Sequence, residues 1–114
     1  MAIAVLTNGS QAVDTTEWSI TTDSAGPDAE TTDGVFQIFL DVSDMTTGDE
    51  LQIRIYEKVR SGDTQRIVYQ QNLFGPQATP IYVTPGLVLM HGWDCTLDAI
   101  AGTITVFWKI LQVS

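Results

Sequence analysis

The chain has 114 residues, enough for a single domain with one modest hydrophobic core. Its net charge of −9 argues against direct binding of nucleic acid, because phosphates must be neutralised by basic side chains. Only 17% of the residues are charged, fewer than in a typical globular protein. We therefore expect an unusually uncharged surface that is partly covered by partners.

The N-terminal segment is apolar but short. Residues 1–6 contain no basic side chain and are followed by Thr7-Asn8-Gly9, so the sequence predicts neither a signal peptide nor a membrane span. We interpret residues 1–11 as a candidate N-terminal arm of one β domain that covers residues 1–114. The first six residues of this arm could pair with a neighbouring subunit as an added strand.

Alternation of apolar and polar residues predicts strands along most of the chain, and no stretch carries a helical stripe. In the first half of the chain the predicted strands cover residues 2–6, 12–20, 35–42 and 50–60. An acidic, Thr-rich stretch over residues 21–34 contains Gly26-Pro27 and predicts an exposed loop.

The second half continues the same pattern. Residues 64–73 return as the partner of residues 50–60 and complete a β-hairpin. Prolines and glycines separate the short segments at residues 81–83, 87–90 and 93–97 and indicate edges and turns, and a final strand is predicted at residues 103–113. The final strand is apolar on both faces, and such a strand is usually covered on both sides. Together these elements predict an all-β fold of about seven or eight short strands, either an antiparallel β-sandwich, which we favour, or a partly open β-barrel.

Residues that carry catalysis are scarce. His91 is the only histidine and lies in a loop-like stretch, and neither a nucleophile elbow nor a phosphate-binding glycine loop occurs. Cys95 is the only cysteine, which excludes an intramolecular disulfide and predicts a buried core thiol. We therefore expect no enzyme, no catalytic residue and no cofactor.

The acidic residues offer at most a weak case for a metal site. Calcium prefers six to eight oxygen ligands. The two acidic groups that could supply them are Asp23, Asp28, Glu30 and Asp33, and Asp41, Asp44, Asp49 and Glu50. Neither group has the spacing of a known calcium loop, so we expect solvated acids and no metal.

The candidate interface residues are apolar, aromatic or basic side chains in the arm or on outward strand faces. They are Ile3, Val5, Trp18, Phe39, Arg54, Tyr56, Lys58 and Arg66. Four of the five cations lie between residues 54 and 66, where they either form a basic patch for an acidic neighbour or are solvated strand charges. A solvent-exposed Trp93, with Asn72 or Gln77 nearby, would instead favour a platform for binding sugar.

Several segments occur in an order that resembles small structural proteins encoded in the head gene clusters of tailed bacteriophages. The resemblance covers about two-thirds of the chain. The matching segments are Asp33-Gly34-Val35-Phe36-Gln37, Leu40-Asp41-Val42, residues 48–59, residues 62–69, residues 92–97 and Ala101-Gly102-Thr103. Where proteins of this type often carry a basic, Gly-rich loop before the last strand, this chain has Gly102-Thr103-Ile104-Thr105.

The resemblance implies a decoration or cement protein on the exterior of a capsid, made in the host cytoplasm. The implied partner is the major capsid protein, and the protein is expected to form a homo-oligomer, with a trimer favoured, and to bind neither nucleic acid nor membrane. The alternative is a tail or adhesion module of the same architecture that binds a glycan on the host surface. The family offers no catalytic residue to carry over.

Overall fold

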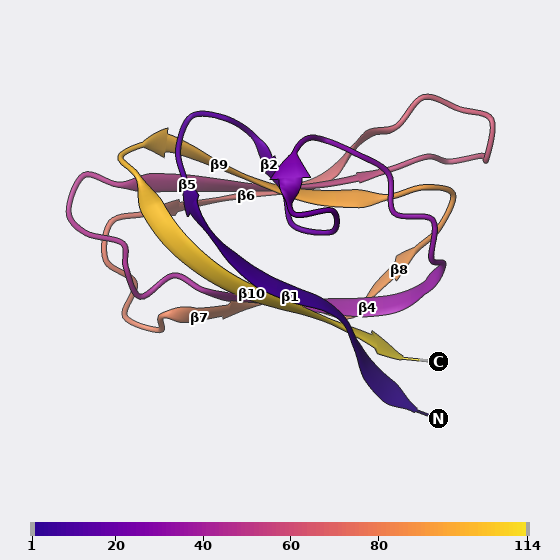
Figure 1. Cartoon of the computed structure of the whole chain (residues 1–114), viewed down its shortest axis with the longest axis horizontal. Helices are drawn as coiled ribbons and strands as arrows, with labels where there is room; N and C mark the ends of the chain where they lie inside the picture. Colours follow the sequence, from indigo (N-terminus) through magenta and orange to yellow (C-terminus); the bar gives the residue numbers. More distant parts are fainter. Residues whose placement is uncertain (1, 114) are drawn as a thin grey trace.

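The computed structural model describes residues 2–113, which form a β-sandwich of two antiparallel sheets (Figure 1). Of the two predicted architectures, the sandwich is therefore correct. The strands are β1 (Ile3–Val13), β2 (Trp18–Ser19), β3 (Ser24–Ala25), β4 (Gly34–Asp41), β5 (Glu50–Glu57), β6 (Arg66–Phe74), β7 (Ile81–Val83), β8 (Leu87–Leu89), β9 (Asp94–Ala101) and β10 (Ile104–Val113). The described residues include no helix long and apolar enough to cross a membrane.

Within residues 2–113, each sheet has five strands. Sheet A has the order β1-β10-β4-β7, and β8 also pairs with β4 further along the same edge. Sheet B has the order β3-β2-β9-β5-β6. The first and last strands of the chain are therefore neighbours in sheet A, whereas the predicted hairpin, β5 with β6, lies in sheet B (Figure 1).

The core lies between the sheets and is built from the inward residues of the alternating strands. Ile38 and Leu40 of sheet A and Ile53 and Leu97 of sheet B are fully buried, as expected where one face of each strand packs inward. The Phe36 and Trp93 rings, 4.6 Å apart, join the two sheets. Cys95 is also fully buried, which confirms the prediction of a core thiol.

The N-terminal strand corrects one prediction. Residues 2–6 and 12–20 were expected to form two strands separated at Asn8-Gly9, but residues 3–13 form the single strand β1, which pairs with β10 along its length except at a β-bulge between Val5 and Thr7. Much of the segment interpreted as an arm is thus part of sheet A. A Cβ atom at Gly9 would lie 2.9 Å from Cζ2 of Trp108, so Gly9 is a site of close approach inside a strand rather than a break.

The acidic segment over residues 21–34 is tied to sheet B at several points. It contains the short strand β3, and Glu30 forms an isolated bridge with Trp93. Trp18 in β2 is half-buried against the core and donates its indole N–H to Asp23. The chain from residue 14 to residue 30 therefore crosses the edge of sheet B and covers part of its outer surface.

Candidate functional site: the two outer faces of the sandwich

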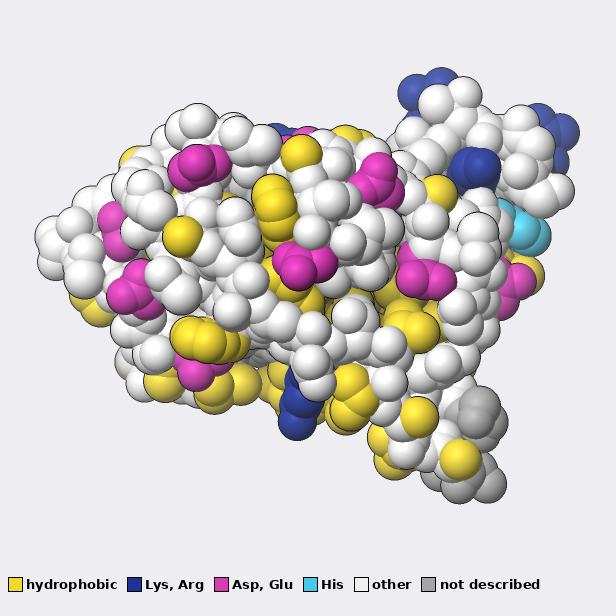
Figure 2. Space-filling view, viewed as in Figure 1, with side chains coloured by type: hydrophobic (Ala, Val, Ile, Leu, Met, Phe, Trp, Pro, Cys, Tyr) yellow, Lys and Arg dark blue, Asp and Glu magenta, His cyan; other side chains and the backbone are white. Residues whose placement is uncertain are grey.

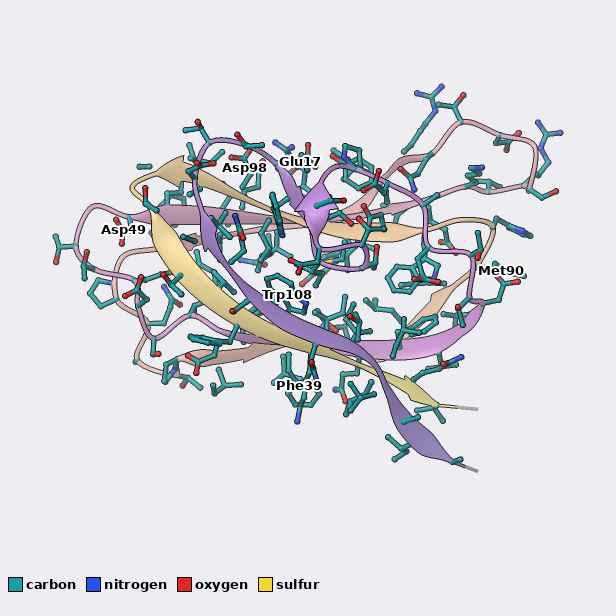
Figure 3. All side chains as sticks on the ribbon, in the orientation of Figure 1. Glu17, Phe39, Asp49, Met90, Asp98 and Trp108 are labelled. Carbon is teal, nitrogen blue, oxygen red and sulfur yellow. The ribbon has the colours of Figure 1, made fainter. Side chains whose placement is uncertain are left out.

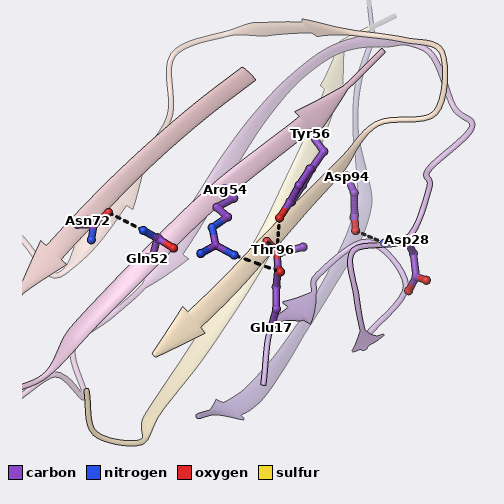
Figure 4. A network of polar contacts seen from close by, with 8 residues as sticks. All are labelled: Glu17, Asp28, Gln52, Arg54, Tyr56, Asn72, Asp94 and Thr96. Atoms are coloured by element: carbon purple, nitrogen blue, oxygen red, sulfur yellow. Dashed lines mark hydrogen bonds and ion pairs between the residues drawn. The ribbon is translucent and has the colours of Figure 1, made fainter. Parts of the chain in front are cut away.

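The outer face of sheet B carries a polar network centred on Glu17 (Figure 4). The Glu17 carboxylate accepts hydrogen bonds from the hydroxyls of Tyr56 and Thr96 and forms an ion pair with Arg54 at 3.1 Å. Burial, followed by the hydrogen bond to Glu17, raises the pKa of Tyr56. The side chains of Arg54 and Glu17 are only 22% and 18% exposed, so neither is free to bind a partner as a solvated charge.

A second anchor on the same face is the buried carboxylate of Asp94. It accepts hydrogen bonds from the Thr21 hydroxyl at 2.6 Å, from the Ser19 hydroxyl at 2.9 Å, and from the backbone N–H groups of Asp28 and Cys95. Burial raises the pKa of Asp94, although these four hydrogen bonds act in the opposite direction. With every donor coming from the chain itself, Asp94 holds residues 19–28 onto sheet B.

The two anchors give the outer face of sheet B a structural role. A catalytic carboxylate needs access to substrate, and Asp94 is fully buried. Burial raises the pKa of the Cys95 thiol, which makes it a poor nucleophile. Among residues 2–113, no group of three or more His, Cys, Asp or Glu side chains is placed to hold a metal ion.

The outer face of sheet A is apolar and uncovered within the described chain. We call it the sheet A face. Pairing in register brings together side chains from β1, β10, β4, β7 and β8 that alternate with the buried core residues. Its apolar residues are Ile3, Val5, Val35, Phe39, Ile81, Val83, Val88, Phe107, Leu111 and Val113. Phe107 is 55% exposed and Val88 70% exposed, although both are in strands.

Figures 2 and 3 show how this face lies in the molecule. In Figure 2, hydrophobic side chains gather along the lower margin, below the position of β7 and β10, whereas most acidic side chains lie higher. In Figure 3, Trp108 lies between the sheets and Phe39 projects from the opposite side of sheet A. The two aromatic residues therefore mark the inner and outer sides of the same sheet.

Two charged side chains of opposite sign lie within the sheet A face. The Lys109 ammonium lies 4.6 Å from the centre of the Phe39 ring, a cation–π contact. Asp41 accepts hydrogen bonds from Ser43, and these lower the pKa of its carboxyl. A shallow hollow of about 380 Å³ lies between them, lined by Phe39, Asp41, Ile81, Phe107, Trp108 and Lys109.

The tip of the β5–β6 hairpin is the third surface feature. It projects beyond the body of the sandwich and carries Lys58, Arg60 and Arg66 (Figures 1 and 2). Arg60 forms an exposed ion pair with Asp63 at 3.0 Å, and Lys58 is half-buried beside Gly92. Arg66 is exposed at the start of β6.

The structure divides the predicted interface residues among these surfaces. Ile3, Val5 and Phe39 share the sheet A face, where Ile3 is 64% exposed. Lys58 and Arg66 lie at the hairpin tip. The remaining three, Trp18, Arg54 and Tyr56, belong to sheet B or its covering segment and are at least half-buried.

Sequence reasoning missed several members of the sheet A face as site residues, namely Val35, Ile81, Val83, Phe107 and Lys109. The signal for Phe107 was available, since the final strand is apolar on both sides. Val35 had a similar signal in the half-apolar outer side of its strand. Ile81 and Val83 lie in a three-residue strand, which is too short for alternation to assign a face.

Comparison with protein-family models, curated proteins and solved structures found no match to this chain.

Proposed function

We propose that this protein is a non-enzymatic structural component of a larger assembly, and specifically a decoration protein on the capsid exterior of a tailed bacteriophage. In this role it binds across subunits of the major capsid protein and stabilises the shell. Weak contacts with several capsid subunits then combine into tight binding through multivalency.

The observation that carries the assembly part of the proposal is the sheet A face, whose exposed apolar side chains favour a bound partner. A soluble domain that acts alone rarely presents a strand whose two sides are both apolar, because one side then stays in contact with water. A partner that covers this side lowers the free energy of the system. Here β10 buries Val106 and Ile110 on one side and exposes Phe107 on the other. Its neighbours β1 and β4 extend the apolar surface in both directions.

The order of segments that resembles phage head proteins supports the more specific part of the proposal. The matching residues form β4, the β5–β6 hairpin and β9, so they lie in both sheets. A glycan-binding role, the alternative, has less support because Trp93, the side chain that would serve as its platform, is fully buried. Asn72 is also engaged, through hydrogen bonds with Gln52 and Glu50.

Co-sedimentation with phage shells tests the proposal. Shells that lack the protein are mixed with increasing amounts of it, and shells that already carry it serve as the matched control. We expect saturation at a fixed ratio of protein to capsid subunits on the bare shells only, together with a higher rupture temperature. Equal binding to both shells, or none to either, would contradict the proposal.

A further inference from the structure

The charges on the sheet A face restrict the kind of partner that can cover it. The molecule has a net charge of −9, yet the two charged side chains that line the hollow of this face, Lys109 and Asp41, sum to zero. Neither of them forms an ion pair within residues 2–113. A partner that covers the face must therefore supply one negative and one positive group, or leave two charges desolvated without compensation.

The register between β10 and β4 arranges these charges on a diagonal. Lys109 lies opposite Phe39, and Phe107 lies opposite Asp41. The four side chains thus occupy the corners of a quadrilateral, with the two charges on one diagonal and the two aromatic rings on the other. The quadrilateral surrounds the hollow of about 380 Å³.

This arrangement complements itself under a two-fold rotation. If a second copy faces the first across an axis that runs along the Phe39–Phe107 diagonal, Lys109 of each copy lies over Asp41 of the other. The same rotation places the aromatic rings of the two copies together over the hollows. Each contact between the two copies then occurs twice, with the roles of the copies exchanged, as a two-fold interface requires.

We propose that the sheet A face binds the same face of a second copy of this chain, forming a two-fold symmetric dimer. The inference deepens the proposed function, on which it rests for the view that the protein acts in an assembly, by naming the partner at this face. A two-fold pair differs from the trimer that the resemblance implies, because a diagonal of opposite charges pairs with itself under a two-fold rotation. The hairpin tips of both copies remain free for contact with an acidic surface.

The paired strands supply part of the area that such an interface needs. With strands about 4.8 Å apart and a rise of about 3.3 Å per residue, each residue pair covers about 16 Å², so the pairs that join β1, β10, β4, β7 and β8 cover roughly 370 Å² before side-chain relief is added. Stable interfaces begin at about 600 Å² per partner. The exposed edge of β1, which is 11 residues long and contains no charged residue and no proline, lies beside the face and can enlarge the contact.

Sedimentation equilibrium of the full chain tests the dimer directly. We expect a concentration-dependent dimer, and we expect the Phe107→Glu variant to dissociate more than about tenfold more readily because it places a charge at the centre of the interface. Phe74→Glu is the matched control, since Phe74 is 66% exposed but lies on β6 of sheet B. Circular dichroism and urea denaturation establish that both variants fold.

Exchange of the two charges tests the symmetry. Lys109→Asp and Asp41→Lys should each weaken the dimer, because each places like charges opposite one another, and the double variant should recover most of the loss. A partner of any other kind does not predict this recovery. The recovery also distinguishes a specific interface from general hydrophobic association.

The outcomes separate this inference from the proposed function. A chain that stays monomeric at all concentrations, or a dimer that resists Phe107→Glu, would overturn the inference. If such a monomer still saturates bare shells, the capsid role stands without the dimer. If the dimer forms as described and ignores shells, the inference holds and the capsid role fails.

Discussion

The two outer faces of the sandwich differ in polarity and in whether the chain covers them. The outer face of sheet B is polar, and the chain covers it with its own residues 14–30, anchored by Glu17 and Asp94. The outer face of sheet A is apolar and no described segment covers it. The polar groups of a surface can be satisfied by hydrogen bonds within the chain. An apolar surface that the chain leaves uncovered is removed from water only when another molecule binds to it.

This difference separates a face whose contacts stabilise the fold from a face that we propose for contact with a partner. Substitutions on the outer face of sheet B should lower the free energy of unfolding. Substitutions on the sheet A face should leave that free energy nearly unchanged and affect association instead. Four measurements can break or sharpen this comparison.

The largest effect should come from the inner side of sheet A. Phe36→Ala should lower the free energy of unfolding by about 3–5 kcal/mol, because the ring is fully buried against Trp93. Phe107→Ala, in the same sheet but facing outward, should change it by less than about 1 kcal/mol. Urea denaturation at low protein concentration measures both. Similar losses for the two variants would show that the sheet A face is part of the folded core.

A smaller effect is expected from the Glu17 network. Glu17→Ala should cost about 2–4 kcal/mol, because it leaves Arg54 without its counter-charge and two hydroxyls without an acceptor. The matched control is Asp63→Ala, which breaks the exposed ion pair with Arg60 and should cost less than about 1 kcal/mol. If thermal or urea unfolding gives equal costs, the network does not hold the covering segment.

Gly9 tests the close packing of β1 on β10. Gly9→Ala should cost about 1–3 kcal/mol, because the new methyl group would lie 2.9 Å from the Trp108 ring. Gly62→Ala is the control: a Cβ atom there meets nothing within 4 Å, and its cost should stay within about 0.5 kcal/mol. An unchanged free energy of unfolding for Gly9→Ala would mean that the Trp108 ring moves aside freely.

The smallest effect concerns the pH dependence of Asp94. Burial raises its pKa above the ordinary value of 3.8, so the folded state holds this proton more tightly than the unfolded chain. Stability from this group is therefore greatest below pH 3.8 and falls as pH rises through the folded pKa. We expect the free energy of unfolding of the wild-type protein, minus that of Asp94→Asn, to be larger near pH 4 than at neutral pH.

Urea denaturation of both proteins across this pH range measures that difference. Asp44→Asn is a suitable control, since Asp44 is exposed. A difference that grows as pH rises would show that the four hydrogen bonds to Asp94 outweigh its burial.

Much of the strand pattern could be predicted from local alternation. Residues 35–42 and 50–57 alternate so regularly that their inner sides follow from the sequence alone, and the structure confirms both strands. The β5–β6 hairpin was also predictable because its turn residues join two alternating segments. The predicted burial of Cys95 is confirmed for a similar reason, since an isolated thiol in an apolar strand behaves as a small hydrophobic side chain.

The candidate sites were harder to predict because they combine distant segments. Ile3, Val5 and Phe39 were chosen from separate strands, and only the pairing of β1, β10 and β4 places them on one face. Tyr56 was chosen because it faces outward from β5, yet it is buried by its contact with Glu17, 39 positions away. An outward direction within a strand does not determine exposure when another part of the chain packs over it.

The amino-acid sequence by itself determined the all-β class, most strand positions and the inward sides of β4 and β5, because these depend on the two-residue period of the extended backbone. The tertiary structure alone decided that β1 runs through Gly9, that Asp94 anchors residues 19–28, and that sheet A keeps an uncovered apolar face. These features depend on contacts between residues far apart in the chain. Local periodicity contains no information about which distant segment packs on which face.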